Sequence, residues 1–161
     1  NALDRDRASR VQEVPMSLVP VAHPLTAHHD ARGRLVVLLA EGMTRWSAPQ
    51  QIYYTTLFPG LIKAWHRHQY QTDGQTCVAG MVRIVVVSDA GQVWQWVSGE
   101  RAPVCVEIPP GLWHGIQELT GVHDAVVVNG PDRVYDELSP DEERRPWDDP
   151  TIPFEWQRRH G

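Results

Sequence analysis

The feature that most constrains the fold is a succession of short β-type runs, each followed by a turn signal. The runs are rich in β-branched and aromatic residues, and one of them, "VWQWV", alternates with period two. Turn sequences such as "FPG", "SDAGQ" and "IPPG" separate them, and no helical periodicity extends beyond a few turns. About eight strands at such close spacing predict an all-β sandwich or barrel. The runs cover residues 35–42, 50–58, 61–68, 81–89, 93–97, 102–108, 112–119 and 123–130.

One helix is expected near the C-terminus. In "SPDEER", Ser139 suits the N-cap, Pro140 the first helical position and Glu142 the capping-box acid. We therefore predict a short helix over residues 139–145. The following segment, "RRPWDDPTIPFEW", reads as an extended tail anchored by proline and tryptophan side chains.

Length, charge and apolar content bound the class of protein. The 161 residues suit a single domain over residues 16–161, after a flexible polar arm over residues 1–15. A net charge of −5 argues against a nucleic-acid partner. No apolar run reaches the ~18 residues of a membrane span and the charged start has no signal-peptide core, so we expect a cytoplasmic protein without membrane contact. Cys77 and Cys105 lie in apolar runs and are expected as buried free thiols.

Three histidines and an aspartate are the strongest candidates for chemistry. His66 and His68 share one face of an expected strand, because alternate residues of a strand point the same way. Asp73 follows five residues after His68, and His114 lies in "PPGLWHG". These side chains suit metal ligands or a catalytic base with a neighbour. The alternative is that His66 and His68 face solvent on an edge strand while His114 caps a turn.

The two segments that carry these residues resemble the metal motifs of the cupin superfamily. "GLIKAWHRHQYQTDGQTCVAG" resembles the first motif, with Asp73 at the usual glutamate position. "PPGLWHG" resembles the second, although Pro103 replaces its upstream glycine and Glu118 its asparagine. The resemblance implies a jelly-roll barrel and a metal site. Its ligands would be His66, His68, Asp73 and His114, which suit Zn, Fe, Ni or Mn, and no organic cofactor is expected.

Most of the chain resembles one branch of the cupins, the RmlC-like dTDP-4-dehydrorhamnose 3,5-epimerase family. The resemblance spans about residues 25 to 157 and rests on "DARGRL", "GLIKAWH", "QTDGQTCVAGMVRIVVV", "IPPGLWHGIQEL" and "WDDPTIPFEW". It implies an isomerase that epimerises a 4-keto sugar nucleotide, an anionic small molecule, by removing a proton next to the carbonyl. It also implies a homodimer formed by exchanged N-terminal strands, for which the apolar run near residues 35–39 is suited.

The same resemblance implies roles for several residues. The catalytic base corresponds to His66, and the two phosphate-binding arginines correspond to Lys63 and Arg32. The family glutamine of the "QDN" segment corresponds to Gln51.

The sequence departs from this family at two catalytic positions. Asp73 stands where the family has a lysine near the oxyanion, and Val127 stands where it has the tyrosine acid. Tyr135, on the next expected loop, is the candidate for the missing acid. Loss of the lysine together with gain of His68 favours a metal ion as the stabiliser of the oxyanion.

Two further residues are candidates for substrate binding. Arg83 suits a phosphate or carboxylate contact, although an exposed strand arginine fits equally well. Trp113, between Gly111 and His114, is expected to border the pocket.

Three functions compete on this evidence. The first is an epimerase or isomerase that acts on a 4-keto sugar nucleotide or a related ketone. The second is a metal-dependent cupin enzyme, such as a dioxygenase, lyase or cyclase, that acts on a non-sugar small molecule. The third is a ligand-binding cupin without catalysis, because a jelly roll hosts many activities.

Overall fold

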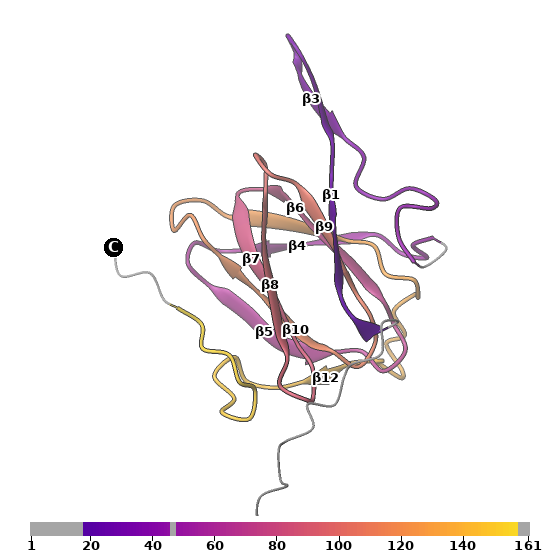
Figure 1. Ribbon diagram of the computed structural model, residues 1–161, viewed down its shortest axis with the longest axis vertical. Helices are drawn as coiled ribbons and strands as arrows, with labels where there is room; N and C mark the ends of the chain where they lie inside the picture. The colour runs from indigo at the N-terminus through magenta and orange to yellow at the C-terminus, as the bar shows by residue number, and fades with distance from the viewer. Residues whose placement is uncertain (1–17, 46–47, 158–161) are drawn as a thin grey trace, which may run out of the picture.

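The computed structural model describes residues 18–45 and 48–157, and these residues are built almost entirely of antiparallel strands (Figure 1). Two five-stranded sheets face each other, with strand orders β1-β9-β6-β11-β4 and β12-β5-β10-β7-β8. A two-stranded hairpin, β2-β3, projects from one end (Figure 1). The strands are β1 Val21–Pro24, β2 Ala27–Asp30, β3 Gly33–Val36, β4 Tyr53–Leu57, β5 Ile62–Arg67, β6 Asp73–Ala79, β7 Met81–Val87, β8 Val93–Gly99, β9 Val104–Ile108, β10 Trp113–Glu118, β11 Ala125–Asn129 and β12 Glu143–Arg144.

The main core lies between the two sheets. Val82, Ile84 and Val86 of β7 point into it because alternate residues of a strand share a face. Cys77 of β6 and Val127 of β11 meet them from the other sheet, and all five are at most 1% exposed. The predicted all-β jelly roll is therefore confirmed.

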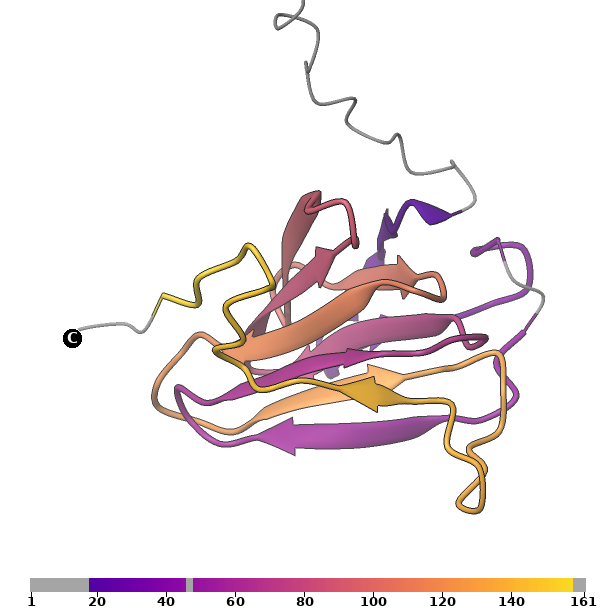
Figure 2. The same cartoon turned by 90° about the horizontal axis from the view of Figure 1, so that it is seen from below.

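The opposite face of β7 is covered by the C-terminal tail. Val85 and Val87 pack there in a second buried cluster with Ile152 and Trp156. Burial on both faces explains why β7 reads as an almost continuous apolar run. Trp65 of β5 joins the cluster with its ring centroid 4.9 Å from that of Trp156. The expected tail with proline and tryptophan anchors is confirmed, and Figure 2 shows it running beside the sheet.

The helix predicted for residues 139–145 is wrong. Glu143–Arg144 is instead the short strand β12, which pairs with Arg67 and His66 at the edge of β5. The carboxylate of Asp141 accepts the backbone N–H groups of residues 69–71. These contacts with β5 and the loop after it hold the segment extended, and they outweigh its local helix signals.

Other expectations are resolved by the same topology. The "SDAGQ" turn joins β7 and β8 as expected, with the N–H of Gly91 donated to the carbonyl of Ser88. Cys77 and Cys105 are buried free thiols, as predicted. Strands β1, β2 and β6 were not predicted. Among the described residues, no helix is long and apolar enough to cross a membrane, and the cytoplasmic location stays a prediction. The predicted arm over residues 1–15 lies outside the described residues.

Candidate active site

A cavity of about 540 Å³ opens between the two sheets. Lys63 and His66 of β5 lie on one wall. Tyr53 of β4, Gln75 of β6 and Asn129 of β11 lie on the wall formed by the other sheet. Glu142, Arg144 and Arg145 line the cavity from the segment around β12. The cavity therefore joins polar side chains from strands far apart in sequence.

An irregularity in strand pairing lets Lys63 and His66 face the cavity together. His66 lies opposite His114 of β10, whereas Lys63 lies opposite Ile116, so three steps on β5 match two on β10. Such a β-bulge re-aims side chains that regular alternation would send to opposite faces. Ile116 packs in the core between the sheets, and His114 shares its face of β10. Their partners Lys63 and His66 therefore both point inward, toward the cavity.

The predicted cluster forms next to the cavity. His66, His68, Asp73 and His114 each offer one ligand atom, and these atoms lie within 4.8 Å of one another. His114 Nε2 lies 3.2 Å from Asp73 Oδ2, and His68 Nε2 lies 3.5 Å from the same oxygen. The ring centroids of His66 and His114 are 4.0 Å apart. His66 is the one member of the cluster that lines the 540 Å³ cavity.

The alternative in which these histidines face solvent is wrong. His68 is 8% exposed, His114 2% and Asp73 0%. Strand β5, which carries His66, lies between β12 and β10 and is not an edge. Burial of three imidazoles and a carboxylate is costly unless the groups satisfy one another or a ligand.

Backbone carbonyls fix the orientation of two imidazole rings. His114 Nδ1 lies 3.0 Å from the carbonyl oxygen of Leu112, and His68 Nδ1 contacts the carbonyl oxygen of Asp141. A carbonyl only accepts, so each Nδ1 carries the hydrogen and each neutral ring presents the lone pair of Nε2. Both Nε2 atoms face Asp73, and that of His68 is buried without a hydrogen-bond partner. The arrangement suits either extra protons or a cation between the rings and the carboxylate.

Burial and neighbouring charges shift the pKa values of His66, Asp73 and His68. Burial lowers the pKa of His66 well below its ordinary value and the nearby His114 adds to this, so His66 is neutral at neutral pH. Burial alone would raise the pKa of Asp73, but His114 and His68 outweigh it and hold that pKa well below its usual range. Burial would lower the pKa of His68, yet the Asp73 carboxylate raises it. His66 is therefore unprotonated and can accept a proton.

Lys63 and the rim of the cavity supply positive charge. Lys63 Nζ donates to Thr55 Oγ1 at 2.7 Å, and both residues line the cavity. Arg144 also lines it and is paired to Glu142 at 2.9 Å. The guanidinium of Arg145 instead stacks on Trp113, 4.3 Å from the ring centroid. The predicted position of Lys63 within the site is thus matched by the geometry.

Three other predicted residues lie away from the cavity of their own chain. Arg32 is at the tip of the β2-β3 hairpin, where its side chain is 89% exposed and pairs with Asp30. Arg83 points to the same face of β7 as Val85, outside the barrel core. Trp113 packs in the cluster under the C-terminal tail, because residues 113 and 114 of β10 face opposite ways. The prediction that Trp113 borders the pocket is therefore wrong.

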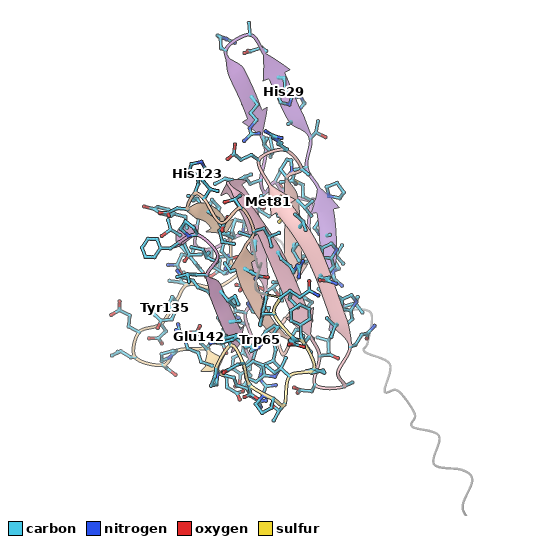
Figure 3. The ribbon with its side chains drawn as sticks, turned by 90° about the vertical axis from the view of Figure 1, so that its left-hand side faces the viewer. His29, Trp65, Met81, His123, Tyr135 and Glu142 are labelled. Carbon is cyan, nitrogen blue, oxygen red and sulfur yellow. The ribbon has the colours of Figure 1, made fainter. Side chains whose placement is uncertain are left out.

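Gln51 and Tyr135 meet each other instead of the cavity. The N–H of Tyr135 donates to Oε1 of Gln51 at 2.9 Å. Tyr135 is 51% exposed on a loop at the margin of the molecule, whereas Glu142 and Trp65, which line the cavity, lie nearer the barrel (Figure 3). The predicted acid is therefore held outside the site.

Sequence reasoning missed Tyr53, Gln75 and Asn129 on the facing wall. The signal was the period-two pattern: Tyr53 shares a face with the buried Leu57, and Asn129 shares one with Val127. Gln75 is 6% exposed and its Oε1 has no hydrogen-bond partner, so it can bind a ligand.

Comparison with known proteins identifies the family. Over 146 residues the chain is 33% identical to Agl13, a probable low-salt glycan biosynthesis epimerase of Haloferax volcanii, covering 85% of this chain and 93% of that protein. The chain belongs to the RmlC-like sugar epimerase family. A second relative is the spore coat polysaccharide biosynthesis protein SpsL of Bacillus subtilis, 30% identical and covering 82% of this chain and 91% of that protein.

A solved structure supports the RmlC-like fold independently. The dTDP sugar isomerase of Desulfovibrio desulfuricans G20 superposes with a TM-score of 0.78 at 26% identity, covering 85% of this chain and 90% of that chain. No model of a known protein family matches the sequence. The RmlC-like resemblance predicted from sequence motifs is therefore confirmed by whole-chain comparison.

Proposed function

We propose that the protein is an epimerase of 4-keto-6-deoxy sugar nucleotides and that His66 removes the proton next to the carbonyl. The observation that carries the proposal is a neutral imidazole, its pKa lowered by burial, that opens onto a 540 Å³ cavity. A C–H group beside a ketone is a weak acid, and a positioned base with a free lone pair accelerates its loss. The relative Agl13, a probable epimerase, supports the same chemistry.

The charges around the cavity suit the anionic part of such a substrate. Lys63 and Arg144 lie on its lining and can pair with phosphate oxygens. Thr55 and Gln75 add hydrogen-bonding groups beside them, for the hydroxyls of a sugar. Lys63 is the one lysine of the chain, so Lys63→Met removes every lysine ammonium group. If Lys63 binds phosphate, this variant should bind the nucleotide part of the substrate more weakly.

Solvent exchange tests the proposal. The protein is incubated in D₂O with dTDP-, UDP- and GDP-linked 4-keto-6-deoxy sugars, and deuterium at C3 and C5 is followed by mass spectrometry. We expect incorporation with the wild type and a loss of about 10²- to 10⁴-fold in His66→Asn. The control His123→Asn changes an exposed loop histidine away from the cavity and should exchange normally (Figure 3). Absence of exchange with every nucleotide would remove the proposal.

A divalent cation bound by His68, Asp73 and His114, with His66 beside them, is a second proposal. It is supported by two Nε2 lone pairs that face one carboxylate oxygen, and by the buried His68 Nε2 without a hydrogen-bond partner. Metal-bound histidines are commonly oriented by a hydrogen bond from their other nitrogen, and Leu112 and Asp141 accept such bonds here. When bound, such an ion would act as a Lewis acid toward a carbonyl oxygen.

Metal analysis separates the epimerase from the metal-dependent cupin enzyme on a non-sugar molecule. The protein is loaded with Zn²⁺, Mn²⁺, Fe²⁺ or Ni²⁺, dialysed and analysed by mass spectrometry. We expect one ion per chain, lost in His68→Ala and kept in the control His123→Ala. An ion kept in His66→Ala leaves His66 free to be the base. An ion lost in His66→Ala, together with absent sugar exchange, favours the other enzyme class, and no ion in any sample contradicts the metal proposal.

The homodimer is proposed on the exposed apolar side chains of the projecting hairpin. Leu35 is 61% exposed and Val37 48%, although both are large and apolar. Pairing with a second copy would bury them, and Arg32 at the hairpin tip could then serve the neighbouring chain. Light scattering should give a dimer for the wild type and a monomer for Leu35→Asp, whereas a monomeric wild type would contradict the proposal.

A further inference from the structure

Tyr53 lies across the cavity from His66. It is the first residue of β4, in the sheet that faces the one containing β5. Its side chain and that of His66 line the same cavity. A ligand bound between the sheets is thus flanked by an imidazole on one wall and a phenol on the other.

The hydrogen bonds around Tyr53 determine which role its hydroxyl can take. The backbone N–H of Gly74 donates to Oδ1 of Asn129 at 2.9 Å, which fixes the orientation of that amide. The NH₂ group of Asn129 therefore points the other way and donates to the Tyr53 hydroxyl oxygen at 2.8 Å. The phenol oxygen is an acceptor in this contact, so its own hydrogen is available to donate into the cavity.

The phenol also keeps its proton at neutral pH. Burial raises the pKa of Tyr53 to about 12, and the Asp73 carboxylate adds to this, while the bond from Asn129 acts in the opposite direction. One wall therefore presents the His66 imidazole and the other a protonated phenol, the two groups that proton removal and proton return at a single carbon require.

Inversion at a carbon next to a ketone needs two groups on opposite faces. The base takes the C–H proton from one face, the C–H electron pair forms the enolate, and the carbonyl oxygen becomes the oxyanion. The enolate carbon must then take a proton from the other face, or the original configuration returns. We propose that Tyr53 is the catalytic acid that delivers this second proton. The inference rests on the proposed epimerase function.

The proton balance of the step is closed by solvent. The Tyr53 O–H bond breaks as the new C–H bond forms, which leaves a phenolate accepting a hydrogen bond from Asn129. Tyr53 is 41% exposed, so water can reprotonate the phenolate. His66 lines the same cavity and returns its proton to solvent there before the next turnover. The other tyrosine candidate, Tyr135, lies on an outer loop and does not line the cavity.

The test separates proton removal from inversion. Tyr53→Phe is incubated with the same three 4-keto-6-deoxy sugar nucleotides in D₂O, and deuterium incorporation and epimer formation are measured separately, the latter by NMR. We expect incorporation within about fivefold of wild type, because His66 can return deuterium to the face it left, and epimer formation lowered about 10²- to 10⁴-fold. Circular dichroism and the melting temperature establish that the variant is folded.

Matched controls and opposing outcomes complete the design. Tyr54→Phe, at an adjacent residue that is 70% exposed, and Tyr135→Phe should both form epimer at the wild-type rate. Epimer formation by Tyr53→Phe within fivefold of wild type overturns the inference, as does equal loss of exchange and epimer formation in a folded variant. Wild type without exchange overturns the proposed function and the inference with it, whereas wild type with exchange and an active Tyr53→Phe overturns the inference alone.

Discussion

At the scale of single residues, the position of the proposed base His66 depends on Gly115, which has no side chain. A Cβ at Gly115 of β10 would lie 2.3 Å from the Cβ of Ala64 and 2.9 Å from its Cα. Strand β5 can pass this close only because residue 115 is glycine. The next residue of β10 toward its start, His114, pairs with His66, so the glycine also sets the 4.0 Å separation of the two rings.

Gly115→Ala should therefore destabilise the protein and disturb the site. We expect a loss of about 1–3 kcal/mol in the free energy of unfolding, because the extra methyl overpacks a closed contact. Solvent exchange should fall as well, since β5 must shift and carry His66 with it. Urea unfolding and the deuterium assay measure the two effects. Ala64→Gly in the same background removes the closest atom and should recover part of the stability; a double variant no more stable than Gly115→Ala would contradict this explanation.

The residues predicted most successfully were those whose spacing is local. His66 and His68 share a face because they are two apart, and "PPGLWHG" supplied His114. Tyr53 and Asn129 were missed because their meeting depends on the pairing of β4 with β11, where they lie opposite each other. Strand order is a property of the whole sheet and is absent from the spacing within any one run.

At the scale of elements, the segment after residue 138 shows tertiary contacts overriding a local signal. "SPDEER" has the composition of a helix start, yet the carboxylate of Asp141 binds the N–H groups of residues 69–71 and its carbonyl orients His68. In strand β6, tertiary contacts instead make a strand from a sequence that does not look like one. "DGQTCVA" is polar for a central strand, but it pairs with β9 and β11, and Asp73 and Gln75 are buried where they face polar partners or the cavity.

Asp141→Ala tests this role of the segment. Three backbone N–H groups would lose their acceptor, and we expect the free energy of unfolding to fall by about 1–3 kcal/mol. Asp136→Ala is the matched control, because Asp136 accepts N–H groups within its own exposed loop, and it should change stability by less than about 0.5 kcal/mol. Urea denaturation of both variants provides the measurement, and equal effects would argue against a special role for Asp141.

At the scale of the whole molecule, buried acids serve different purposes in different places. Asp73 lies in the histidine cluster beside the cavity. Glu118, 2% exposed, instead joins two loops by accepting hydrogen bonds from Gly60 in one and from Thr120 and Gly121 in the other. In the cupin resemblance both positions belonged to metal motifs. Asp73 and Glu118 are both buried at strand ends, but only Asp73 lies in the histidine cluster. The motif positions therefore predicted burial correctly for both residues and a place in the site for only one.

The loop-joining role of Glu118 predicts a defined pH dependence of stability. Burial would raise the pKa of Glu118, but hydrogen bonds from the Thr120 hydroxyl and three backbone N–H groups outweigh it and hold that pKa below its ordinary value. A carboxylate whose pKa is lower in the folded state stabilises the protein fully above its unfolded pKa. This contribution is lost as the pH falls through the folded pKa.

Glu118→Gln should therefore cost about 1–3 kcal/mol in the free energy of unfolding at pH 7. The difference from wild type should persist at pH 6 and shrink as the pH falls below the pKa of an unfolded glutamate, roughly 4.3, because the unfolded chain then takes up a proton that the folded wild type resists. Urea denaturation at each pH measures it. Glu100→Gln is the control: this carboxylate accepts one backbone N–H at an exposed position, so its effect should be small. A Glu118→Gln difference that stays constant down to pH 3 would show that packing of the side chain, and not its charge, holds the two loops together.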